Sequence, residues 1–151
     1  MSGRFATYSQ TMELAEALDF IRPRKNGIVT ALKADGRPQL SNITYHVSES
    51  GIIRISVTDG RAKTHNLRRD PRVSLYVGQE DFWAYAVLEG RAELSPVATA
   101  VDDATVDELI SLFRAVQGEH PNWNEYRAAM VADKRLVLRI HPERAYGMLR
   151  Y

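Results

Sequence analysis

Residues 52–77 read IIRISVTDGRAKTHNLRRDPRVSLYV, a basic stretch between two runs that alternate apolar and polar side chains. The alternation predicts strands over 52–58 and 73–77. Between them we expect a short helix over about residues 63–69, because the residue before Pro71 avoids helical dihedrals. Arg61 and Lys63 would then lie at the amino end of this helix.

Basic side chains at the amino end of a helix indicate a bound anion. That end carries a partial positive charge, so cations there are unfavourable unless an anion lies among them. Free backbone N–H groups next to Arg61 and Lys63 would form a phosphate site. The alternative is a solvated basic helix, which is what most charge runs are. We favour the phosphate site, because the basic residues crowd a helix start directly after a strand.

Three further arginines follow in the same stretch: Arg68, Arg69 and Arg72. They are weaker candidates for the phosphate site. They either face water or contact a longer anionic tail of the ligand.

The length and composition of the chain limit the kinds of protein that it can be. The 151 residues form one expected domain, large enough to bury a core without disulfides. A net charge of +1 argues against broad nucleic-acid or membrane-surface binding, and the absence of cysteine excludes thiolate chemistry and disulfides. The first residues lack the apolar stretch of a signal peptide and no segment reaches transmembrane length, so a cytoplasmic location is expected.

The rest of the chain predicts short strands with helices between them. Asp35-Gly36 favours a hairpin turn, and Gly90 is expected to bend one long strand. Asp102 and Asp103 are placed to cap a helix that presents Val106, Leu109, Ile110 and Phe113 on one face. The further expected strands are 27–32, 38–47, 82–94, 136–140 and 144–148, and the further expected helices are about 10–22 and 121–132.

This order of elements predicts a mainly β fold with peripheral helices. Short strands at hairpin spacing favour a closed or half-closed antiparallel barrel over a parallel sheet. No internal repeat or linker divides residues 1–151. We therefore expect a single barrel domain.

The residue pattern lacks the usual catalytic motifs. The four histidines show no metal-binding spacing, and Ser41 does not lie in a G-x-S-x-G motif. Asp102 and Asp103 are better explained as helix caps than as catalytic carboxylates. An enzyme with this sequence would rely on a cofactor for its chemistry, and no catalytic residue can be assigned.

Two other groups of residues are candidates for ligand contact. Gln39, Ser41 and Asn42 carry hydrogen-bonding side chains just after a turn, although turn chemistry and an edge strand are the better explanation of this stretch taken alone. Trp83 and Tyr85 are expected on one face of a strand, where such a pair either packs in a core or forms a wall for a flat ring system.

Three motifs, taken in order, resemble one family. GRPQLSN at 36–42, RAKTHNLRRDPR at 61–72 and WAYAVLEGRAEL at 83–94 are similar to the flavin/deazaflavin oxidoreductases of the pyridoxamine 5′-phosphate oxidase-like type. They are most similar to the actinobacterial branch that uses coenzyme F420. The resemblance covers residues from about 25 to 148. It implies a split β-barrel of the FMN-binding type and a homodimer with its cofactors in grooves between the two subunits.

The resemblance also implies roles for individual residues. Arg61, Lys63 and Thr64 would hold the coenzyme phosphate, with the Ala62 amide and Asn66 nearby. Gln39, Leu40 and Ser41 would line the deazaflavin ring, and the strand residues Ser56, Val57 and Thr58 would lie beneath it. Trp83 and Tyr85 would reach the cofactor from the partner subunit.

The expected function is hydride transfer from reduced F420 to an unsaturated organic substrate such as an enone, a quinone or a tetrapyrrole. Pyridoxamine 5′-phosphate oxidases close their substrate site with a carboxy-terminal arginine–histidine element, whereas residues 143–151 read ERAYGMLRY, which argues against vitamin B6 oxidation. Two alternatives remain open: an FMN-binding oxidase on the same scaffold, and a non-catalytic protein that binds or carries the cofactor. The partners expected are a small-molecule substrate and a second copy of the chain, with no nucleic acid and no membrane.

Overall fold

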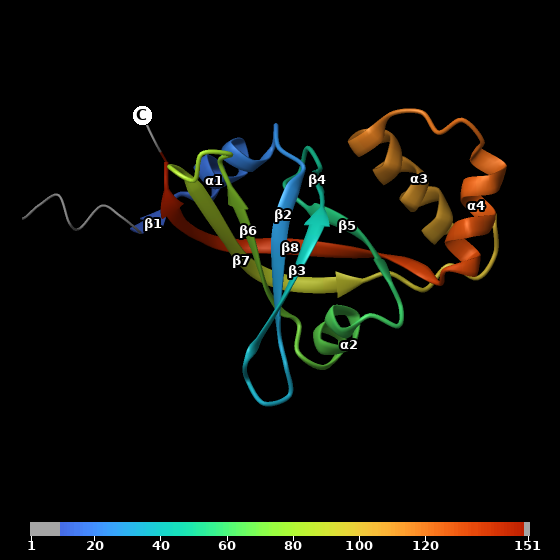
Figure 1. The fold of residues 1–151 in the computed structure, drawn as a ribbon, viewed down its shortest axis with the longest axis horizontal. Helices are drawn as coiled ribbons and strands as arrows, with labels where there is room; N and C mark the ends of the chain where they lie inside the picture. The colour runs from blue at the N-terminus through green and yellow to red at the C-terminus, as the bar shows by residue number, and fades with distance from the viewer. Residues whose placement is uncertain (1–9, 150–151) are drawn as a thin grey trace, which may run out of the picture.

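The computed structural model describes residues 10–149, and its strands form one curled antiparallel sheet with four helices around it (Figure 1). The strand order is β3-β2-β6-β7-β8-β5-β4, and β1 pairs with β8. This half-barrel confirms the predicted fold class. The strands are β1 (Gln10–Met12), β2 (Asn26–Leu32), β3 (Pro38–Thr44), β4 (His46–Val47), β5 (Ile53–Thr58), β6 (Arg72–Gly78), β7 (Tyr85–Leu94) and β8 (Arg135–Met148).

The core fills the concave side of the curled sheet. Along β5, Ile53, Ile55 and Val57 are buried while the residues between them are only half-buried, as expected when one face of a strand lines the core. Helix α1 (Leu14–Ile21) packs Ala17 and Ile21 into the same cluster, and it ends just before Pro23 as expected.

Helix α2 (Ala62–Arg69) connects β5 to β6, one residue longer at its start than the sequence indicated. Leu67 anchors it in the core, and Arg69 donates a hydrogen bond to the carbonyl oxygen of Leu32. The helix ends at Asp70-Pro71, so the predicted stop signal is confirmed. These contacts place the basic helix beside the β2–β3 hairpin.

Helices α3 (Ala104–Gln117) and α4 (Trp123–Ala132) form a hairpin at one end of the molecule (Figure 1). The Asp103 carboxylate accepts a hydrogen bond from the Val106 amide at 2.8 Å, which confirms the predicted cap. A second apolar cluster joins the helices to Val137, on the convex side of β8. The hairpin therefore forms a wall above β5 and β8.

Four predicted elements were wrong in their extent. Residues 10–12 form β1 and not the start of a helix, because Met12 and Thr11 pair with Ala145 and Tyr146 of β8. The two expected carboxy-terminal strands are one strand, β8, in which Pro142 lies opposite Gly90. The bend expected at Gly90 is present as a register shift between Glu89 and Gly90.

The expected strand over 38–47 is interrupted at Tyr45. This side chain turns into the core, where its hydroxyl donates to the Ile21 carbonyl oxygen at 2.7 Å. β7 begins at Tyr85 and not at Phe82, because Phe82 has φ 64° and forms a turn in which its amide donates to Gln79. Trp83 therefore lies in the turn, and the expectation that Trp83 and Tyr85 share a strand face was wrong.

Candidate cofactor site

The amino end of α2 exposes unpaired donors. Arg61 has extended dihedrals at the N-cap position, no side chain caps the helix, and its first turn contains no acidic residue. Within residues 10–149, the amides of Ala62 and Lys63 have no acceptor in the chain, whereas the Thr64 amide already donates to Arg61. This end of the helix can therefore accept an anion.

Arg61 and Lys63 form a cluster of positive charge around these amides. In the described part of the chain, neither side chain has a carboxylate within ion-pair distance. Partial burial lowers the pKa of Lys63, and the nearby charges of Arg61 and Arg135 lower it further. A bound anion would relieve this repulsion, which is what a phosphate site requires.

Thr64 and Asn66 make contacts of their own on α2. The Thr64 side chain is buried, and its hydroxyl donates to the Thr58 carbonyl oxygen at 2.8 Å, which fixes the start of the helix to the end of β5. The Asn66 side-chain oxygen accepts from Arg69 at 3.1 Å. Their contact with a phosphate stays a prediction, and Thr64 is in any case positioned to hold the amides in place.

The predicted ring-lining residues come from two strands near α2. On β3, the Gln39 side-chain nitrogen donates to the Ser41 hydroxyl at 2.8 Å, while its buried side-chain oxygen has no partner among the described residues. Leu40 is 59% exposed on the opposite face of β3. β3 pairs only with β2 in the described sheet, so its other edge is open for a ligand.

On β5, the side chains of Ser56 and Thr58 lie on the face away from the core, where Ser56 faces α3 and α4 across a cleft, while Val57 points into the core. Val57 can therefore contact a ligand only through its backbone. A cleft of about 250 Å³ runs past Ser56 and Thr44, with Leu109, Leu112 and Phe113 of α3 on its other side.

Arg135 is a residue of this site that sequence reasoning missed. It opens β8 opposite Thr58, and it lines the same cleft as Ser56. One guanidinium nitrogen lies 3.5 Å from the Ser56 hydroxyl, and its buried Nε has no partner in the described chain. Only the pairing of β5 with β8 brings it near Lys63, so no local sequence signal could have identified it.

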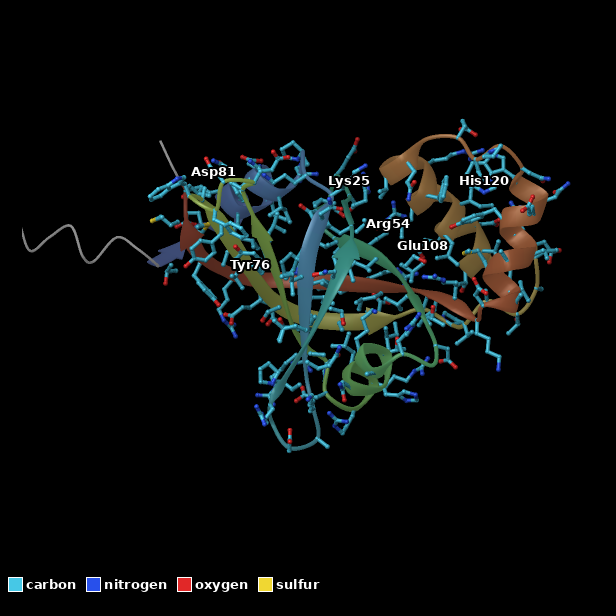
Figure 2. All side chains as sticks on the ribbon, viewed as in Figure 1. Lys25, Arg54, Tyr76, Asp81, Glu108 and His120 are labelled. Atoms are coloured by element: carbon cyan, nitrogen blue, oxygen red, sulfur yellow. The ribbon has the colours of Figure 1, made fainter. Side chains whose placement is uncertain are left out.

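A charged network holds α3 against the sheet. Glu108 of α3 forms an ion pair with Arg139 of β8 and lies 3.8 Å from Arg54 of β5, and Figure 2 shows Arg54 and Glu108 side by side. Arg54 also lies beside His46, whose pKa is lowered by burial and then by the charges of Arg54 and Arg22. The network fixes the helix that walls the cleft.

A larger hollow of about 900 Å³ lies between residues 22–26 and the β6–β7 turn. Its rim carries charges of both signs, including Lys25 and Asp81, which Figure 2 labels near the upper edge of the molecule. Because neither sign predominates, this hollow selects an anion less well than the start of α2.

Trp83 and Tyr85 lie far from α2 within one chain. Tyr85 pairs with Gly78, at the end of β6 opposite the end that α2 joins, and its ring stacks on Tyr76 with centroids 5.7 Å apart. Trp83 is 60% exposed in the preceding turn. The structure thus brings together the predicted residues of β3, β5 and α2, but not these two aromatic residues.

A half-barrel with a cationic helix start beside an open strand edge has the features that binding of an anionic cofactor requires. No group of three metal-ligating side chains occurs among the described residues. The comparison with protein families agrees: the model described as pyridoxamine 5′-phosphate oxidase matches residues 14–149. The chain belongs to this family of flavin and deazaflavin oxidoreductases.

Solved structures support the same fold. A conserved hypothetical protein of Mycobacterium tuberculosis is 26% identical over 91% of this chain and 84% of its own, with a TM-score of 0.69. An F420 reductase is 19% identical over 84% and 94% of the two chains, with a TM-score of 0.64. A FAD-binding protein of Mesorhizobium loti is 20% identical over 93% and 96%, also with a TM-score of 0.64.

None of the helices in the described part of the chain combines the length and apolar character needed to span a bilayer.

Proposed function

We propose that this protein is a coenzyme F420-dependent oxidoreductase that acts as a homodimer. The observation that carries the proposal is the start of α2, where Arg61, Lys63 and two unpaired amides surround a position with no acidic partner among the described residues. Family membership supports a flavin-type cofactor, and the similarity to an F420 reductase supports the deazaflavin.

The chain's own residues would bind and orient the cofactor. Arg61, Lys63 and the Ala62 amide would hold its anionic ester. The open edge of β3 and the convex face of β5 at Ser56 would position the ring, and the α3 wall would limit water access to the cleft. When bound, reduced deazaflavin supplies a hydride to an unsaturated organic substrate.

Direct titration tests this proposal. Purified protein is titrated with oxidised F420 and with FMN while its intrinsic tryptophan emission is recorded. We expect saturable F420 binding that is tighter than FMN binding and that strengthens with the number of glutamates in the F420 tail. Tighter FMN binding would favour the oxidase alternative, which the FAD-binding structural neighbour also supports. Tight F420 binding without turnover of enones, quinones or tetrapyrroles would favour a carrier.

Lys63 should make F420 binding depend on pH. An anion is held by the protonated amine, and the pKa of Lys63 in the free protein is already lowered by burial, Arg61 and Arg135. Affinity should therefore be full below this lowered pKa and fall as pH rises through it, before the ordinary lysine value of about 10.4 is reached. Lys63→Arg stays protonated and should flatten this fall. If the F420 affinity of the wild type does not change between neutral pH and a pH of about 10, the assignment is contradicted.

The homodimer is supported by an apolar face on the convex side of the sheet. Tyr76, Tyr85 and Tyr146 lie on adjacent strands β6, β7 and β8, beside the exposed turn that carries Phe82 and Trp83. Phe82 is 79% exposed, which is unusual for so large an apolar side chain. A second copy covering this face would bring Trp83 and Tyr85 toward the partner's cofactor.

Trp83→Ala should weaken F420 binding without dissociating the dimer. Loss of one aromatic contact with the ring is expected to reduce affinity by about 2- to 13-fold. Calorimetric titration measures the affinity, and analytical ultracentrifugation measures the dimer. Val101→Ala, at an apolar side chain that is 49% exposed on the connection to α3, provides a matched control and should leave both unchanged. Dissociation of the Trp83 variant with no separate binding defect would show that this residue only packs between subunits.

A further inference from the structure

We propose that Arg135 is a third cationic ligand of the cofactor's anionic ester and makes the site selective for phosphorylated over unphosphorylated ring compounds. This inference rests on the proposed function, because it concerns the same site. It adds a residue from the far end of the chain, at the junction between α4 and β8, to the cations of α2.

The position of Arg135 is fixed by strand pairing. It lies opposite Thr58, and the Thr58 carbonyl accepts from the buried hydroxyl of Thr64 in α2. The backbone therefore ties Arg135 and the start of α2 to the same residue of β5. The positive charge of Arg135 also repels the protonated amine of Lys63, and this repulsion contributes to the lowered pKa of Lys63.

The guanidinium of Arg135 lacks a partner of its own. Its Nε is buried without an acceptor in the described chain. A terminal guanidinium nitrogen lies 3.5 Å from the Ser56 hydroxyl, which is too long for a strong hydrogen bond. Arg54 of β5 also has a buried Nε without an acceptor among the described residues, but its guanidinium lies 3.8 Å from Glu108, which also pairs with Arg139. Within residues 10–149, Arg135 has no such carboxylate.

A buried guanidinium donor without an acceptor indicates a ligand that supplies one. Arginine presents its N–H groups in a planar fork that matches the oxygens of a phosphate. Arg61, Lys63 and Arg135 together form a cluster of three cations, and no carboxylate among the described residues pairs with any of them. Arg135 also lines the cleft that begins at Ser56. It therefore marks the point where the ester would end and the rest of the cofactor would begin.

Matched pairs of ligands test this role. The dimeric protein is titrated with F420 and with its unphosphorylated deazaflavin chromophore, and with FMN and riboflavin. Arg135→Gln should weaken binding of both phosphorylated compounds by about 10-fold and change binding of both unphosphorylated compounds by less than about two-fold. Arg135→Lys should recover part of the loss, because it restores the charge but not the fork. Lys134→Gln, at the neighbouring exposed cation, should change neither.

The outcomes separate this inference from the function on which it rests. If the wild type does not bind the phosphorylated compounds more tightly than the unphosphorylated ones, the proposed anion site itself is wrong. If it does, and Arg135→Gln keeps that preference or weakens both members of each pair equally, only the role of Arg135 is wrong. Thermal unfolding identifies a variant that fails to fold. In that case Arg135→Lys answers the same question, since loss of the fork should lower only the affinity for the phosphorylated compounds.

Discussion

Lys63→Ala should weaken F420 binding by about 10- to 150-fold, corresponding to the loss of roughly 1.5–3 kcal/mol from a charge-assisted hydrogen bond. The effect is expected to be large because the side chain is partly buried beside unpaired amides, and no carboxylate in the described chain competes for it. Fluorescence titration of tryptophan emission measures it.

A cation at the other end of the same helix provides the control. Arg68 lies in the last turn of α2 and forms an ion pair with Asp59 at 2.6 Å. Arg68→Ala removes a positive charge from the same helix but not from its amino end, and it should change F420 affinity by less than about two-fold. Equal losses in the two variants would indicate a general effect of charge and not a phosphate site. An unchanged affinity in Lys63→Ala would reject the assigned role.

Gly90→Ala should destabilise the fold by about 4 kcal/mol or more, one of the few changes expected to exceed the usual range for single substitutions. A Cβ atom at Gly90 would lie 2.0 Å from the His141 carbonyl oxygen and 2.8 Å from the Pro142 Cα. Both are backbone atoms of the paired strand β8, so no side-chain rotation relieves the overlap. The register shift beside Gly90, where β7 bends, would have to change.

Chemical denaturation measures the free energy of unfolding. Gly60→Ala is the matched control, because a Cβ there meets no atom within 4 Å and the residue has no left-handed dihedral that would strain an alanine. It should change the free energy of unfolding by less than about 0.5 kcal/mol. A Gly90 variant as stable as the control would contradict the account of how β7 and β8 curve around the core.

Local signals explain which parts of the fold the sequence predicted. The end of α2 follows from Pro71, the cap of α3 from Asp103 and the bend of β7 from Gly90, and each depends only on the residue and its immediate neighbours. The half-barrel also follows from the spacing of strands and turns. The start of α2, with its two cations, was predicted to within one residue.

The errors come from long-range pairing. Met12 precedes Leu14, Leu18 and Ile21, which have near-helical spacing, yet Met12 pairs with Ala145 of β8 as part of a strand. Tyr45 interrupts an alternating strand because its hydroxyl finds the carbonyl of Ile21 in the core. Arg135 was missed for the same reason, since its neighbours in the site are fixed by the β5–β8 register and not by its neighbours in the sequence.

A crystal structure of the dimer with bound F420 tests the central claim most directly. We predict that the phosphate oxygens accept hydrogen bonds from the Ala62 and Lys63 amides and contact the Arg61 and Lys63 side chains. A structure in which the ester lies elsewhere, with the start of α2 facing solvent or covered by an acidic side chain of the protein itself, would contradict the account.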